Sequence, residues 1–174
     1  MCQHGLCPVL MSGRILLLFW ASCSFIIKPG LFVGKILKPV VQLERSGCGI
    51  ASVSVLVGLS YPEVKSIANA LGIFAHDARL WSETAHVRTL LNHFGVQTGS
   101  DEIPFRSWES LPDIALLAIK WHLEKGRPYW HWVVFVRENG QSCVLDSKKN
   151  LRTNRRTDFG RMKPKWYISV TDLK

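Results

Sequence analysis

The sequence predicts an α+β fold, with N-terminal helices packed on a C-terminal antiparallel sheet. Segments with helical spacing and cap residues lie between residues 49 and 94, and apolar runs of strand length follow from residue 116 onward. Helices and strands that are segregated along a chain are typical of this class. Of the 174 residues, 47% are apolar and 20% are charged, which gives a single domain enough material for a core.

Three helices are expected in the first half of the chain. The run Gly49–Gly58 is apolar or small throughout and should form the central, buried helix. Ser60-Tyr-Pro-Glu63 is a good cap, which predicts a helix over Pro62–Leu71 that stops at Gly72. A third helix is expected over Ser82–Phe94, before Gly95. Its inward face would consist of Ala85, Leu90, Leu91 and Phe94.

The strands follow in the second half. The runs His131–Val136 and Cys143–Asp146 flank the turn-forming Asn139-Gly140, which predicts a hairpin. The apolar run Asp113–Ile119 fits either a helix or a strand. Lys165–Val170 alternates like an edge or closing strand.

Cys48 lies in the segment Gln42-Leu-Glu-Arg-Ser-Gly-Cys48-Gly-Ile-Ala-Ser52, at the expected start of the central helix. A helix N-terminus carries unpaired N–H groups and a partial positive charge, which favour a reactive thiolate over the thiol. Gly47 and Gly49 flank the thiol, and we expect them to allow the close backbone approach that a tetrahedral intermediate requires. The competing interpretation is a small buried core cysteine.

His131 and Asp146 are expected at the same end of the predicted hairpin. If the turn centres on Asn139-Gly140, the two are a couple of residues out of register, and a bulge or splay would bring them together. A carboxylate there would orient the imidazole, and the imidazolium would keep Cys48 ionised. The structural alternatives are a satisfied strand-end histidine and a turn aspartate.

Three motifs occur in order: Gln-x5-Cys-Gly-Ile-Ala-Ser, His-Trp-Val-Val and Val-Leu-Asp. On these motifs the chain, from about Ile36 to Val170, resembles the papain-like cysteine peptidases of the bacteriocin-processing, double-glycine-leader type and their stand-alone relatives. The resemblance implies a papain-like fold and favours a strand over Leu116–Trp121.

The resemblance also implies site roles. Cys48 would be the nucleophile, His131 the general base and acid, Asp146 the orienting group, and Gln42 the side-chain donor of the oxyanion hole. The activity implied is cleavage of a peptide bond in a peptide or protein substrate through a thioacyl-enzyme. Two alternatives stay open: an acyltransferase or transglutaminase-like enzyme on the same fold, and a catalytically silent peptide-binding module.

The ligand-forming residues do not predict a metal or another cofactor. His86 and His93 lie seven residues apart on one predicted helix, but no acidic or sulfur ligand has matching spacing. The five cysteines are odd in number and lack zinc-site spacing, so we expect a reducing compartment, the cytoplasm. Trp130 and Trp132 bracket His131 and should point away from its face, into packing contacts.

The net charge of +9 is divided unevenly, and residues 1–40 contain four basic and no acidic side chains. Residues 148–165 contain eight Lys or Arg and one acid, which we interpret as a solvated loop; the alternative is a site for an acidic partner or, less favoured, for nucleic acid. Residues 1–35 are expected to be an apolar N-terminal extension outside the fold, with the peptidase domain over 36–174. Within them, residues 15–27 are too short an apolar run to span a bilayer, so weak membrane association is the alternative location. The oligomeric state is left open.

Overall fold

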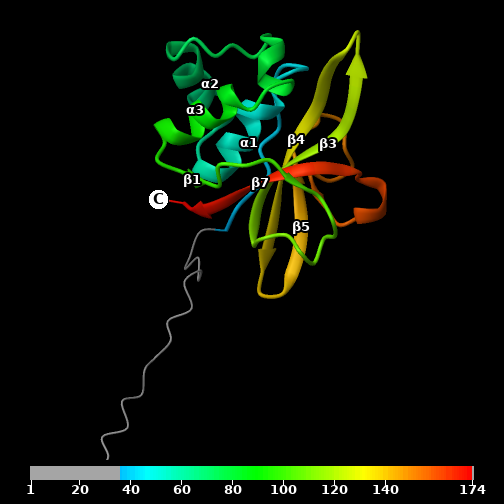
Figure 1. The fold of residues 1–174 in the computed structure, drawn as a ribbon. Helices are drawn as coiled ribbons and strands as arrows, with labels where there is room; N and C mark the ends of the chain where they lie inside the picture. Colours follow the sequence, from blue (N-terminus) through cyan, green and yellow to red (C-terminus); the bar gives the residue numbers. More distant parts are fainter. Residues whose placement is uncertain (1–35, 174) are drawn as a thin grey trace, which may run out of the picture. The chain divides into compact units, whose positions relative to one another are not determined.

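The computed structural model describes residues 36–173, in which helices precede an antiparallel sheet (Figure 1). The α+β prediction is therefore confirmed. The helices are α1 (Cys48–Val57), α2 (Tyr61–Ala70), the 3-10 helix η1 (Ala78–Trp81) and α3 (Ala85–His93). The strands are β1 (Gln97–Thr98), β2 (Ile103–Pro104), β3 (Ile114–Glu124), β4 (Arg127–Glu138), β5 (Gln141–Asp146), β6 (Arg155–Arg156) and β7 (Pro164–Asp172), with the 3-10 helix η2 (Phe159–Arg161) before β7.

The predicted helices form with small shifts at their ends. α1 and α2 each begin one residue before the expected start, and the reciprocal cap between Ser60 and Glu63 is present. α3 begins at Ala85, three residues later than expected, because the chain first forms η1 and a turn. Ala85 is exposed, so its assignment to the inward face was wrong, and Val87 lies there with Leu90 and Leu91.

The strand order is β1-β7-β3-β4-β5-β6, with β2 also paired to β7. Lys165–Val170 was expected to be an edge or closing strand; it forms the last strand of the chain, β7, but β7 lies between β1 and β3 and is not at an edge. Its neighbours β1 and β2 have two residues each, too short to leave a pattern in the sequence. The run from Asp113 resolves as the long strand β3, which pairs with both β4 and β7.

The hairpin between β4 and β5 forms as predicted. Asn139 and Gly140 both have positive φ, 51° and 76°, and Glu138 pairs with Gln141 across the turn. Positive φ at both central residues is the geometry that favours Asn-Gly in a two-residue hairpin loop. The turn therefore fixes the register on which the position of Asp146 depends.

The two faces of the sheet are covered differently. On one face, alternate residues such as Trp132 and Val134 pack with α1, α2 and α3 in the larger apolar core. On the other face, Val133 and Phe135 form a second core that loop residues around Trp108 and Phe159 cover. Because β4 alternates, one strand contributes to both cores.

The expectations for residues 1–35, including membrane association through residues 15–27, fall outside the described residues. Within residues 36–173, none of the helices combines the length and apolarity needed to cross a bilayer.

Candidate active site

α1 places Cys48 at its first position. Gly47 is the N-cap, and the amide of Ala51 donates the first-turn hydrogen bond to the Gly47 carbonyl at 3.0 Å. The N–H groups of residues 48–50 therefore precede the first helical hydrogen bond, and they point out of the helix start. Cys48 is only 3% exposed, yet it lines a cavity.

The glycines beside Cys48 have a packing role. A Cβ at Gly47 would lie 1.9 Å from the Tyr61 hydroxyl, and a Cβ at Gly49 would lie 3.0 Å from side-chain atoms of Leu80 and Val87. From the sequence we expected these glycines to serve the approach of substrate and to add nothing to core packing, and the second expectation was wrong. They let α1 sit close to its neighbours, which fixes the position of Cys48.

β4 and β5 bring His131 and Asp146 together. Asp146 pairs with Val133, so His131 is its diagonal neighbour, two residues along on the same face. The β4–β5 register runs without a shift from Val133 to Glu138, so no bulge between these strands is needed. The His131 Nε2–H donates to Asp146 Oδ1 at 2.7 Å, as predicted for the orienting acid.

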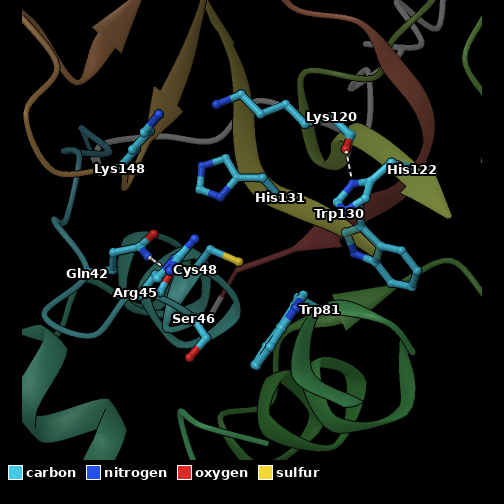
Figure 2. Close-up of a pocket in the computed structure, with 10 residues that line it drawn as sticks. All are labelled: Gln42, Arg45, Ser46, Cys48, Trp81, Lys120, His122, Trp130, His131 and Lys148. Atoms are coloured by element: carbon cyan, nitrogen blue, oxygen red, sulfur yellow. Dashed lines mark hydrogen bonds between the residues drawn. The ribbon is translucent and has the colours of Figure 1, made fainter. Parts of the chain in front are cut away.

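The start of α1 lies where β5 ends. The pairing of β4 with β5 stops at Asp146, and the backbone N–H of Gln42 donates to the Ser147 carbonyl at 2.9 Å just beyond. The loop that precedes α1 is thereby attached to the end of β5. This attachment brings Cys48, from the helical half, to His131 on the sheet (Figure 2).

His131 is held in its charged form. Burial alone would lower the pKa of His131, but the Asp146 carboxylate and the neighbouring Cys48 outweigh it and raise the pKa to about 9. Because Nε2 donates to Asp146, Nδ1 is the ring nitrogen available to Cys48. The three residues therefore have the connectivity of a nucleophile, a base and an orienting acid.

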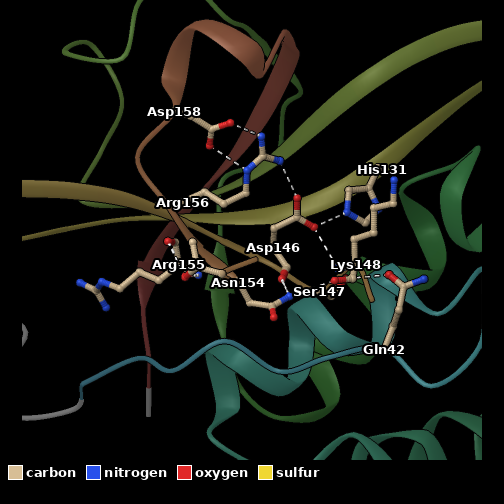
Figure 3. Close-up of polar contacts among 10 residues, drawn as sticks. Gln42, His131, Asp146, Ser147, Lys148, Asn154, Arg155, Arg156 and Asp158 are labelled. Carbon is tan, nitrogen blue, oxygen red and sulfur yellow. Dashed lines mark hydrogen bonds and ion pairs between the residues drawn. The ribbon is translucent and has the colours of Figure 1, made fainter. Parts of the chain in front are cut away.

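Asp146 is fully buried and multiply bonded (Figure 3). Burial alone would raise the pKa of Asp146, but His131, the Lys148 N–H and Arg156 lower it well below its ordinary value. Oδ1 also accepts from the Lys148 backbone N–H at 3.0 Å, and Oδ2 accepts from Arg156 Nη1 at 2.8 Å. Asp146 is thus a carboxylate at neutral pH, held by His131, the Lys148 N–H and Arg156.

The sequence did not reveal the role of Arg156. Its side chain is 12% exposed and bridges Asp146 to Asp158, to which Nε and Nη2 donate at 2.9 and 2.8 Å. Residues 148–165 are therefore more than a solvated loop, because Arg156 and Asn154 both stabilise the end of β5. Asn154 donates to the backbone carbonyls of Asp146 and Lys148. The run of basic residues in 148–165 does not by itself indicate which arginine is buried.

Gln42 lies at the cavity but its amide is engaged. Nε2 donates to the carbonyls of Glu44 and Arg45 at 2.9 and 2.7 Å, and Oε1 accepts from Ser147 Oγ at 2.8 Å (Figure 3). Gln42 is 5% exposed. In this geometry the two hydrogen bonds that Gln42 Nε2 donates fix the loop before α1. Gln42 can donate to an oxyanion only if it gives up one of them.

The cavity beside Cys48 has a volume of about 460 Å³ (Figure 2). Its lining side chains come from the loop before α1, from the first residue of α1, from η1, β3 and β4, and from the segment that follows β5. They are Gln42, Arg45, Ser46, Cys48, Trp81, Lys120, His122, Trp130, His131 and Lys148.

β3 is irregular next to this cavity. Its register with β4 shifts between Ile119 and His122, and Lys120 has a φ of 55°. A bulge of this kind re-aims side chains beside a site, and here Lys120 and His122 reach the cavity lining. Nothing in the alternation of the sequence marks this irregularity.

The two tryptophans beside His131 both pack in the core, and Trp130 also lines the cavity. Trp132 is fully buried, and its Nε1 donates to the Leu80 carbonyl at 2.9 Å. Trp130 packs edge-on against Trp132 and Trp166, as predicted for a core residue. It also lines the cavity, and its buried Nε1 has no hydrogen-bond partner among the described residues. The packing interpretation therefore holds fully for Trp132 and in part for Trp130.

No family model matches this chain, and no curated protein matches it either. Of the two histidines weighed as a metal pair, His86 lies 3.4 Å from Asp77 Oδ2. In the part of the chain that the structure describes, no cluster of three or more His, Cys, Asp or Glu side chains could hold a metal ion.

Proposed function

We propose that residues 36–173 form a papain-like cysteine peptidase with Cys48, His131 and Asp146 as its catalytic residues. The single observation that carries the proposal is the hydrogen-bonded His131–Asp146 pair beside a cysteine that begins a buried helix. A buried imidazole with a raised pKa, next to a thiol in a cavity, is the arrangement that activates a cysteine nucleophile.

The proposed reaction has two steps. The Cys48 thiolate attacks the peptide carbonyl carbon, a C–S bond forms, and His131 transfers its Nδ1 proton to the leaving amine as the C–N bond breaks. Water then attacks the thioester and gives a proton to His131, and the C–S bond breaks to release the acid. Asp146 keeps its charge throughout and orients the ring.

The oxyanion would be stabilised at the start of α1. The Cys48 backbone N–H belongs to the first helical turn, where N–H groups have no partner within the helix. Gln42 is the proposed second donor, after exchange of one of its bonds to the Glu44 or Arg45 carbonyl. Preorganised donors of this type usually supply a factor of about 10²–10³ in turnover.

The test is peptide cleavage by the full-length protein. The wild type should cut a proteome-derived peptide library, leaving new amino termini that mass spectrometry identifies, and Cys48→Ala should cut none. Cys143→Ala is the matched control, since Cys143 is buried on β5, and it should cut the same peptides. Cleavage that persists in Cys48→Ala would refute the proposal. Mass gain by an added primary amine in place of water would instead identify acyl transfer.

A further inference from the structure

The cavity around Cys48 carries positive charge that no carboxylate in its lining offsets. Arg45, Lys120 and Lys148 line it, and no carboxylate does. Among residues 36–173, none of these three cations lies in an ion pair, whereas five arginines outside the cavity, Arg127 and Arg137 among them, pair with carboxylates. Cations that line a cavity without a counter-ion are suited to bind an anion.

The two lysines lie close together above His131. Lys120 extends across the His131 ring toward Lys148 in Figure 2. The pKa of Lys120 is lowered, chiefly by partial burial and next by the charge of Lys148. Asp146 attracts Lys120, but this carboxylate already accepts hydrogen bonds from His131 and Arg156. An additional anion between the lysines would relieve their mutual repulsion.

The opposite side of the cavity is aromatic. Trp81 and Trp130 lie on the far side of Cys48 from Lys148 in Figure 2, and both belong to or pack against the apolar core. The cleft therefore has an apolar end and a cationic end, with the thiol between them. A bound peptide would place its charged group at the lysine end.

We propose that this cavity binds a carboxylate of the substrate, held by the exposed cations Lys120, Lys148 and Arg45 in its lining. The inference rests on the proposed peptidase function and adds a preference to it. A carboxylate comes either from an acidic side chain near the scissile bond or from the C-terminus of a peptide. Both present the same two acceptor oxygens to the lysines.

Three electrophiles of equal size separate these cases. They are N-chloroacetyl-glutamic acid α-amide, which has a side-chain carboxylate, N-chloroacetyl-glutamine, which has a terminal carboxylate, and the neutral N-chloroacetyl-glutamine amide. In each case the Cys48 thiolate displaces chloride and a C–S bond forms, which peptide mass spectrometry locates and times. At least one carboxylate probe should label Cys48 on the order of fivefold faster than the neutral probe at low salt.

Lysine variants test whether Lys120 and Lys148 cause the preference for the carboxylate probes. Lys120→Gln and Lys148→Gln should each lower the ratio of carboxylate-probe rate to neutral-probe rate, and the double variant should bring it near one. Lys163→Gln is the matched control, because Lys163 is exposed and does not line the cavity. Equal rates for all three probes in the wild type would overturn the carboxylate site and leave the peptidase proposal intact. No labelling of Cys48 by any probe would overturn both.

Discussion

Cys48 and Cys143 are two buried free cysteines in different settings. Their exposed fractions are 3% and 2%, and both belong to the larger apolar core. Cys48 is the first residue of α1 and neighbours His131. Cys143 lies within β5, opposite Val136, and burial raises the pKa of its thiol.

The comparison teaches that burial alone does not decide the chemistry of a cysteine. A mid-strand thiol surrounded by apolar side chains stays protonated and behaves as a small core residue. A thiol at a helix start, beside an imidazole with a raised pKa, has a helix N-terminus and an imidazolium to stabilise its anion. Removing one component of the setting of Cys48 should therefore change the reactivity of Cys48 and leave that of Cys143 unchanged.

The largest effect is expected for Asp146→Asn. An amide would place donor hydrogens against Arg156 or His131 and would remove the charge that both now face. Turnover and Cys48 alkylation should fall by about 10²–10⁴, while Cys143 alkylation should not fall. Stability should drop by about 3 kcal/mol in urea unfolding, because Arg156 is left without its buried partner.

Asp158→Asn is the control for that prediction. Asp158 pairs with the outer side of Arg156 and is itself exposed, so its loss should lower stability much less than the loss of Asp146 does. Wild-type alkylation of Cys48 in Asp146→Asn would show that Asp146 has no part in activating the thiol.

The next effect concerns pH and stability. The pKa of His131 is raised from 6.5 to about 9, so protonated His131 stabilises the fold. This contribution is fully present below pH 6.5 and is lost as pH rises through about 9. The wild type should therefore exceed His131→Ala in unfolding free energy by about 2–3 kcal/mol more at pH 6 than at pH 10.

His93→Ala is suitable as a control, since His93 is exposed on α3 and leaves the His131–Asp146 pair intact. Its unfolding free energy should follow the wild-type pH dependence. A constant difference between wild type and His131→Ala across this range would show that His131 is not held in its charged form.

The smallest structural effect is expected at Gln42. Gln42→Ala would leave the carbonyls of Glu44 and Arg45 without their donor and should cost about 1–3 kcal/mol. As an oxyanion donor, Gln42 should also contribute about 10²–10³ to turnover, measured on a cleaved peptide at saturating concentration.

Ser147→Ala separates the two roles of Gln42. It removes only the hydrogen bond to Gln42 Oε1 and should cost about 1 kcal/mol, with turnover close to the wild type. If Gln42→Ala loses stability while it keeps wild-type turnover, Gln42 only supports the loop before α1.

The sequence revealed the parts of this site that local pattern determines. A cysteine at the start of one apolar run, a histidine at the start of another and an Asn-Gly turn sufficed to place Cys48, His131 and Asp146 on their elements, although β4 itself begins four residues before His131, at Arg127. The triad geometry then followed from strand alternation, although the diagonal pairing made the expected bulge unnecessary.

The remaining features depend on long-range packing. In the sequence, Arg156 cannot be distinguished from the other basic residues around it, and only the fold places it against Asp146. The irregularity of β3 at Lys120 and the attachment of Gln42 to Ser147 join segments that are distant in sequence. Gly47 and Gly49 likewise acquire their packing role only when Tyr61 and Leu80 are in place.

The most direct test of the central claim is the rate of iodoacetamide alkylation at Cys48 relative to Cys143, measured by peptide mass spectrometry at pH 7 in the folded protein. The account predicts that Cys48 reacts at least about 100-fold faster, and that His131→Ala removes most of this difference while the fold is retained. Equal, slow alkylation of both cysteines in the wild type would contradict it.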